Sequence, residues 1–193
     1  MNTRNRAVLF LTVLAVGSSM ASFAGAQQSR ESAQPSESAA SPEMARLAKA
    51  LAGDWNTTES MQKSEFFPDG GSRKGRSHIR LVADGTSLFA EFHSNGSVGK
   101  LDGLYVIWWD KPANIYRFFV CFNDSKTPCK LRGTAHWEGD NFVNDYEEMV
   151  DGKMTKWRDS FVHITPSSHS LIAAMDAGDG TMKTLISTKS SRR

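Results

Sequence analysis

The chain has 193 residues, of which 23 are Lys or Arg, 21 are Asp or Glu and two are Cys. Removal of an N-terminal leader would take away Arg4 and Arg6 and no acidic residue, which leaves 21 basic and 21 acidic side chains. A formally neutral domain lacks the basic surface that nucleic acids require, so nucleic acid is not an expected partner.

The first 26 residues are typical of a secretory signal peptide. Two arginines precede the apolar run Ala7–Val16, which is too short to span a bilayer, and a small-residue cleavage site ends at Ala26. We therefore expect cleavage after Ala26 and a secreted or periplasmic protein without a membrane span. Residues 27–42, rich in Ser, Ala and Gln, predict a disordered linker, and residues 43–190 predict one folded domain.

The domain begins with a short helical pattern and continues with strands. Pro42 and Glu43 are typical of a first helical turn, and Gly53 ends the apolar helical run. Beyond Gly53, turn signals such as Asp84-Gly85 and Asp151-Gly152 recur about every 8–12 residues between alternating segments. We predict an all-β fold: a single antiparallel up-and-down β-barrel of about ten strands with a short N-terminal helix.

The two-residue turns set strand registers and so sort side chains into faces. Around Asp84-Gly85, Ile79 opposes Ala90 and Leu81 opposes Leu88, which makes that face apolar and assigns it to the interior.

The hairpin around Asp151-Gly152 places opposite charges on one face, with Glu147 opposite Lys156 and Asp145 opposite Arg158. Such cross-strand pairs indicate the solvent face. The interior face then pairs Phe142 with Phe161, Tyr146 with Trp157, Asn144 with Asp159, and Glu148 with Thr155.

Cys121 and Cys129 flank a short loop between two predicted strands, and we expect a structural disulfide in a compartment where disulfides persist. If the two cysteines lie directly across from each other, Arg117 lies opposite Gly133 and points into the barrel.

A buried arginine needs a compensating partner because an isolated buried charge is costly. Two interpretations stay open for Arg117. It forms an internal pair with Asp159 or Glu148 through bridging water, or it is a polar anchor at the bottom of an aromatic pocket.

The interior face supplies a candidate ligand-binding set. Trp55, at the start of the first strand, is expected to close one end of the barrel. The predicted set is Trp55, Arg117, Asn144, Tyr146, Glu148, Trp157, Asp159 and His163.

His163 lies four residues from Asp159 along one strand, roughly 13 Å away, so the two form no catalytic dyad. An inward histidine is either a hydrogen-bonded core residue or a residue that binds a ligand. Haem held by His163 is the one cofactor that the pattern leaves open. We predict no other cofactor, no metal site and no catalytic residue.

Sequence signatures of enzymes are missing: there is no Gly-x-Ser-x-Gly, no His-Glu-x-x-His and no Gly-rich phosphate loop. An inward Asp159 or Glu148 could still act as a base in an isomerase- or hydrolase-like enzyme. A carboxylate that titrates well above its ordinary range would support that alternative.

The inward position of Arg117 implies an outward aromatic patch on two neighbouring strands. That patch consists of Tyr105, Ile107, Trp109, Tyr116 and Phe118. An apolar surface of this size needs a cover, either the helix at residues 43–51 or Arg132, or else a second copy or a partner protein.

Several short motifs follow one another in a fixed order: Leu51-Ala52-Gly53-Asp54-Trp55, Trp109-Asp110, Asp124-Ser125 and Trp137-Glu138-Gly139-Asp140. The pattern resembles a bacterial family of secreted lipocalin-like (calycin-like) domains of unknown function with an N-terminal Leu-Ala-Gly-x-Trp motif. The resemblance covers about Leu47 to Lys189. It implies a closed antiparallel barrel and carries over no catalytic residue.

The sequence therefore favours a secreted or periplasmic barrel that binds a small apolar or amphipathic molecule in its lumen. The first alternative is a protein-interaction or dimerising barrel that uses the outer aromatic patch. The second is an isomerase- or hydrolase-like enzyme with an inward carboxylate base.

Overall fold

The computed structural model describes residues 40–123, 129, 131–150 and 152–193. The predicted signal peptide, most of the predicted linker, the Asp124-Ser125 motif and Asp151 lie outside the described residues. No helix within the described part is long and apolar enough to cross a membrane.

The described chain forms one helix and ten strands. They are α1 (Pro42–Leu51), β1 (Gly53–Met61), β2 (Gly71–Val82), β3 (Ser87–Gly96), β4 (Gly99–Asp110), β5 (Ile115–Phe122), β6 (Leu131–Glu138), β7 (Asn141–Val150), β8 (Lys153–Val162), β9 (Ser168–Asp176) and β10 (Met182–Arg192).

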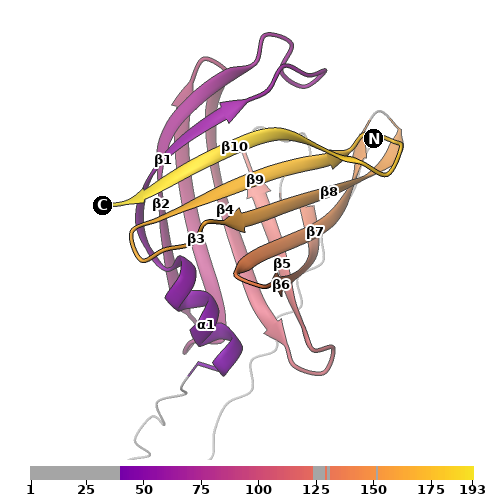
Figure 1. Ribbon diagram of the computed structural model, residues 1–193. Coiled ribbons are helices and arrows are strands. Elements are labelled where there is room, and N and C mark those ends of the chain that lie inside the picture. Colours follow the sequence, from indigo (N-terminus) through magenta and orange to yellow (C-terminus); the bar gives the residue numbers. More distant parts are fainter. Residues whose placement is uncertain (1–39, 124–128, 130, 151) are drawn as a thin grey trace, which may run out of the picture. The chain divides into compact units, whose positions relative to one another are not determined.

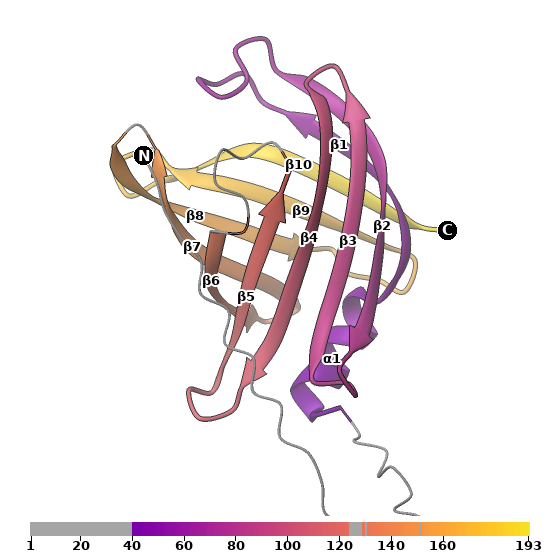
Figure 2. The ribbon, with the colours of Figure 1, turned by 180° about the vertical axis from the view of Figure 1, so that it is seen from behind.

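Each strand pairs antiparallel with its neighbours in sequence, and β1 also pairs with β10, which closes the sheet into a barrel (Figure 1 and Figure 2). The closing ladder runs from Trp55 opposite Arg192 to Met61 opposite Ile186. The predicted all-β, up-and-down barrel with a short N-terminal helix is confirmed.

Helix α1 lies at one end of the barrel, at the lower edge in Figure 1. Ser41 caps it, because its hydroxyl oxygen accepts a hydrogen bond from the backbone N–H of Met44 at 3.3 Å. One face of α1 is apolar and fully buried through Met44, Leu47 and Leu51. The helix is therefore held by core packing and covers that end of the barrel.

Trp55 fills the barrel interior beneath α1, as the sequence predicts. Its side chain is 0% exposed, and its indole N–H donates a hydrogen bond to the carbonyl oxygen of Leu51 at 2.9 Å. The ring meets the edge of His169 at a centroid distance of 4.5 Å, and the Arg192 guanidinium lies 4.5 Å from the ring centroid.

The registers expected from two-residue turns are correct. Ile79 pairs with Ala90 across β2 and β3, and both are buried. Tyr146 pairs with Trp157 and Asp145 with Arg158 across β7 and β8, on opposite faces.

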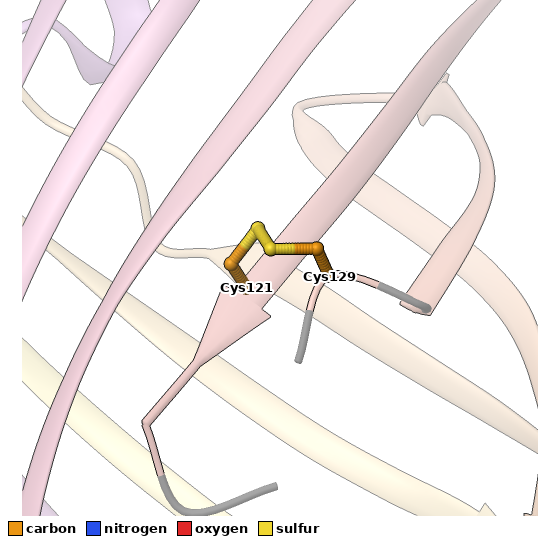
Figure 3. The surroundings of a disulfide bond; sticks show 2 residues. All are labelled: Cys121 and Cys129. Atoms are coloured by element: carbon orange, nitrogen blue, oxygen red, sulfur yellow. A yellow bond between two sulfur atoms is a disulfide. The ribbon is translucent and has the colours of Figure 1, made fainter. Parts of the chain in front are cut away.

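The register expected from the cysteines is wrong by one residue. The disulfide between Cys121 and Cys129 is present (Figure 3). However, Cys129 adopts a left-handed φ of 64° before β6, and the ladder places Arg117 opposite Thr134. Since successive strand residues point to opposite faces, Arg117 lies outside, where its guanidinium binds the Asp110 carboxylate.

The same shift turns the predicted outer aromatic patch inward. Ile107, Tyr116 and Phe118 are 0%, 3% and 2% exposed and belong to the core, with Tyr105 and Trp109 packed against them. The prediction that these five residues form an outer patch is therefore wrong. They need no second copy or partner protein to cover them.

Replacement of Trp55 by Ala should lower the free energy of unfolding by about 3–5 kcal/mol, because removal of the indole would leave an empty space between α1 and the barrel. Urea denaturation measures this loss. Trp108→Ala is the matched control, because Trp108 is half-buried on the outer face and its removal should cost about 1 kcal/mol. Equal losses in the two variants would contradict the role of Trp55.

Candidate ligand-binding site

The barrel interior contains a cavity of about 260 Å³. Side chains from nine of the ten strands, all but β6, and Leu51 of α1 line it. At a share of about 30 Å³ for each water molecule, this volume has room for about eight waters or for one small organic molecule. The wall is mostly aromatic and aliphatic, with a few polar side chains.

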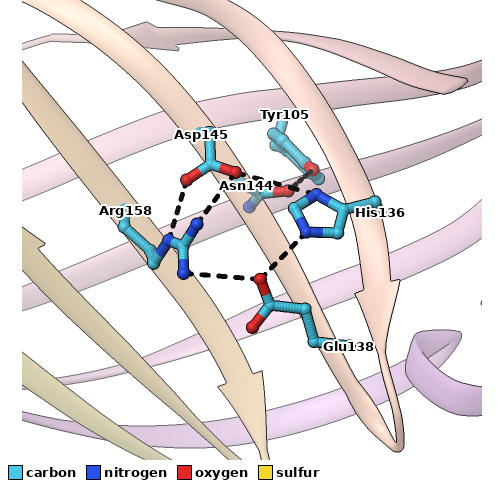
Figure 4. Close-up of polar contacts among 6 residues, drawn as sticks. All are labelled: Tyr105, His136, Glu138, Asn144, Asp145 and Arg158. Atoms are coloured by element: carbon cyan, nitrogen blue, oxygen red, sulfur yellow. Dashed lines mark hydrogen bonds and ion pairs between the residues drawn. The ribbon is translucent and has the colours of Figure 1, made fainter.

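One polar cluster lies on the wall formed by β4, β7 and β8. The Tyr146 hydroxyl donates a hydrogen bond to Asp159 Oδ1 at 3.4 Å. The Tyr105 hydroxyl donates to Asn144 Oδ1 at 3.0 Å, and Asn144 is 3% exposed (Figure 4). The rings of Tyr146 and Trp157 lie nearly parallel, at 7°, with centroids 6.1 Å apart.

Burial dominates the electrostatics of this cluster. It raises the pKa of Asp159 to about 7, and the hydrogen bond from Tyr146 opposes that shift only in part. Burial also raises the pKa of Tyr105 and Tyr146 well above their usual range, with the negative charge of Asp159 adding to the effect. The two phenols therefore stay protonated, and Asp159 is the group that changes charge near neutral pH.

A second polar cluster lies on the wall formed by β1 and β2. Arg73 is directly opposite Glu59, and its Nε donates to Glu59 Oε2 at 2.7 Å. The two side chains are 7% and 12% exposed. The buried arginine that borders the cavity is therefore Arg73, not Arg117.

The alternation of β2 is a sequence signal that places Arg73 on the inner face. Ile79 and Ser77 share the inner face of their strand, and counting back by two from Ser77 reaches Gly75 and then Arg73. The pairing with Glu59 could not be derived in the same way, because a long loop rather than a two-residue turn joins β1 to β2.

Three buried polar atoms within the described residues have no hydrogen-bond partner: Ser94 Oγ, Trp157 Nε1 and His169 Nδ1. All three residues line the cavity. Burial lowers the pKa of His169 to about 4, with a further contribution from Arg192, so the ring is neutral at neutral pH. An unsatisfied buried polar group costs roughly 1–3 kcal/mol, so these three groups lower the stability of the barrel.

Four of the predicted site residues, Asn144, Tyr146, Trp157 and Asp159, come together around the cavity. Trp55 lies next to it, packed against Leu51 and His169, which line the cavity.

The other predicted site residues lie elsewhere. Arg117 is outside the barrel, and Glu148 is exposed near the end of β7. His163 is exposed with a left-handed φ of 52°, because β8 ends at Val162 and the chain leaves the sheet there. The inward placement of His163, on which the haem option relied, is therefore wrong, and the buried histidine is His169.

The outer face of β6 to β8 carries a separate charge network (Figure 4). Arg158 binds Asp145 at 2.8 Å and Glu138 at 3.4 Å, and His136 Nε2 lies 3.0 Å from Glu138 Oε1. Between about a third and a half of each side chain is exposed, so these pairs contribute little stability and represent an ordinary solvated face.

An open groove of about 350 Å³ lies between α1 and strands β4 to β6. Its main polar groups are already engaged. The Tyr116 hydroxyl donates to the Glu43 carbonyl oxygen at 2.8 Å and accepts from Trp137 Nε1 at 3.3 Å, and Arg46 donates to the Gly139 carbonyl oxygen at 3.0 Å. The barrel cavity, whose wall includes residues with unpartnered polar atoms, is therefore the stronger candidate site.

Comparison with known proteins supports the fold and no closer relationship. No protein-family model matches the chain, and neither does any curated protein. The S-type phycobiliprotein lyase CPES from Guillardia theta has a similar structure, with a TM-score of 0.53 and 12% identity over 77% of this chain and 92% of its own.

Two further solved structures, both bound to DFHBI, have lower scores. EF1p2_mFAP2b has a TM-score of 0.43 and 14% identity over 78% of this chain and 99% of its own. The redesigned beta barrel mFAP0 has a TM-score of 0.41 and 12% identity over 74% of this chain and 99% of its own. The likeness to the lyase shows the class of fold: the protein is a calycin-like β-barrel. The resemblance to the secreted lipocalin-like domain family stays a prediction.

Arg73→Met should lower the free energy of unfolding by about 3–5 kcal/mol, because it leaves the Glu59 carboxylate buried without its partner. Urea denaturation at neutral pH measures the loss. The double variant Arg73→Met/Glu59→Leu removes both charges and should regain most of the stability. A double variant as unstable as the single one would show that packing rather than charge pairing matters here.

Asp159→Asn should stabilise the protein at about pH 8 and leave it nearly unchanged at about pH 4. The folded-state pKa of Asp159, about 7, lies above the ordinary value of 3.8, so the wild type loses stability relative to the variant as the pH rises from about 4 through 7. Melting temperatures of both proteins across this range measure the difference. Asp140→Asn, in an exposed turn, is the control and should show no such trend.

Proposed function

We propose that this barrel is a secreted or periplasmic binding protein that holds one small apolar or amphipathic molecule in its cavity. The observation that carries the proposal is the position of the three unpartnered buried atoms, on Ser94, Trp157 and His169. All of them belong to side chains of the cavity wall.

The composition of the wall supports this function. Natural small-molecule sites are mostly apolar and contain a few placed polar groups that set the ligand's orientation. Here aromatic rings supply contact area, and the polar side chains of Asp159 and Asn144 supply orientation. A barrel selected only for stability would gain by replacing these polar groups with apolar ones.

The proposed location rests on two observations. Residues 1–26 have the pattern of a signal peptide. The disulfide between Cys121 and Cys129 is of the kind that persists outside the cytosol.

Native mass spectrometry tests the proposal on the mature protein, purified gently from the organism that makes it. We expect a mass excess that disappears when the same sample is denatured. Trp157→Phe removes the unpartnered N–H and keeps an aromatic ring, so it should lower the affinity for that molecule on the order of tenfold. The free energy of unfolding of the empty variant should not fall.

Trp108→Phe, on the outer face, is the matched control and should leave both properties unchanged. A protein that carries no small molecule, together with identical behaviour of the two Trp→Phe variants, would contradict the binding function.

A second candidate function is an isomerase-like reaction with Asp159 as the base. The raised pKa of Asp159, about 7, favours it because a general base works best when its pKa lies near the working pH. Glu148, the other predicted base, is exposed and less suited. If the recovered molecule is converted by the wild type and not by Asp159→Asn, the protein is an enzyme rather than a carrier.

A further inference from the structure

The charged groups of the cavity wall differ from those that the sequence predicts. The sequence places Arg117 inside, as the partner of Asp159 or Glu148 or as a polar anchor for a ligand. In the structure, the cationic side chain that borders the cavity within the described chain is Arg73, and Glu59 binds it at 2.7 Å. That pair is neutral as a unit.

The histidines do not change this balance. His169 is buried, and its pKa of about 4 keeps the ring neutral at neutral pH. His93 contributes to the wall but directs its ring to Asp102, with Nδ1 2.9 Å from Oδ1, and its side chain is 55% exposed. Asp159 is therefore the ionisable group that gives the described wall a net charge, and this charge is negative.

Asp159 has no cationic neighbour among the described residues. Tyr105 of β4, Asn144 and Tyr146 of β7, and Ala173 of β9 face it, and the hydrogen bond from Tyr146 is long at 3.4 Å. An ionised carboxylate accepts several hydrogen bonds, and one weak bond leaves most of this capacity unused.

Aromatic rings border the same position. Tyr146 and Trp157 lie nearly parallel on adjacent strands, and the Tyr105 ring is close enough to Asp159 for the carboxylate's charge to affect its phenol. The faces of Trp and Tyr rings carry partial negative charge and attract cations. The carboxylate and the rings therefore favour the same kind of group.

We propose that the ligand is an organic cation, an amine whose ammonium group pairs with Asp159 beside Tyr146 and Trp157 while its apolar body fills the barrel. The proposal rests on the binding function proposed above and names the chemical class of the ligand. In a cavity with a mostly apolar wall, a paired ammonium and carboxylate with additional hydrogen bonds offset much of their desolvation cost. A carboxylate ligand such as a fatty acid would instead add a second negative charge beside Asp159.

The proposal predicts how affinity depends on pH. An ammonium ligand binds best to ionised Asp159, so affinity should rise as the pH rises through the titration range of this group. Tyr105 and Tyr146 stay protonated in that range, and His169 stays neutral. Glu148 is exposed near Tyr146 and acts on the cluster from farther away.

Three probes with the same naphthalene body separate charge from shape: 1-naphthylmethylamine, 1-naphthalenemethanol and 1-naphthoic acid. Binding to the mature protein is measured by isothermal titration at about pH 8. We expect the amine to bind more tightly than the alcohol on the order of tenfold, and the acid to bind most weakly. The advantage of the amine over the alcohol should decrease on the order of tenfold between about pH 8 and about pH 5.

Asp159→Asn should remove the advantage of the amine over the alcohol. Asp145→Asn, which removes a carboxylate from the outer face one residue away from Asn144, is the matched control and should behave as the wild type. The pH series on the wild type tests the proposal even if a variant is unstable.

The outcomes distinguish this proposal from the binding function. If amine and alcohol bind equally, or if the acid binds most tightly, the cationic ligand is ruled out and the binding function stands. If none of the three probes binds at about 1 mM, the cationic ligand is ruled out, and the native mass spectrometry described above decides the binding function separately.

Discussion

Pairing of the first strand with the last is the interaction on which the rest of this structure depends. The ladder between β1 and β10 closes the sheet, so every strand must direct half of its side chains into a common interior. An eight-stranded barrel is about the size that side chains can fill, and a ten-stranded one is wider. Trp55 and α1 fill one end, and a cavity of about 260 Å³ remains.

Polar groups inside this closed barrel have large energetic consequences because water has little access to them. Arg73 and Glu59 offset each other's desolvation through their ion pair. Asp159 has no such partner among the described residues, and burial raises its pKa to about 7. Unpaired groups of this kind lower stability, and strongly shifted pKa values in clefts cluster at functional sites of proteins.

The success of the sequence-based prediction depended on the loops. Two-residue turns allow one register, so the pairs of β2 with β3 and of β7 with β8 were predicted correctly, and Tyr146, Trp157 and Asp159 were placed inside. The loop between β5 and β6 is longer, and a disulfide tolerates more than one register. There the left-handed turn at Cys129 shifted the ladder by one residue and moved Arg117 outside.

By itself, the sequence determined the class of fold, the number and direction of the strands, and the aromatic side of the cavity. These follow from alternation, turn residues and capping, which act over a few neighbouring residues. Only the tertiary structure decided the sign of the charge in the cavity, since it placed Arg73 against Glu59, left Asp159 unpaired and buried His169. The contact of Arg73 with Glu59 depends on a register that the long loop between β1 and β2 leaves open, and the packing of His169 against Trp55 joins strands far apart in the chain.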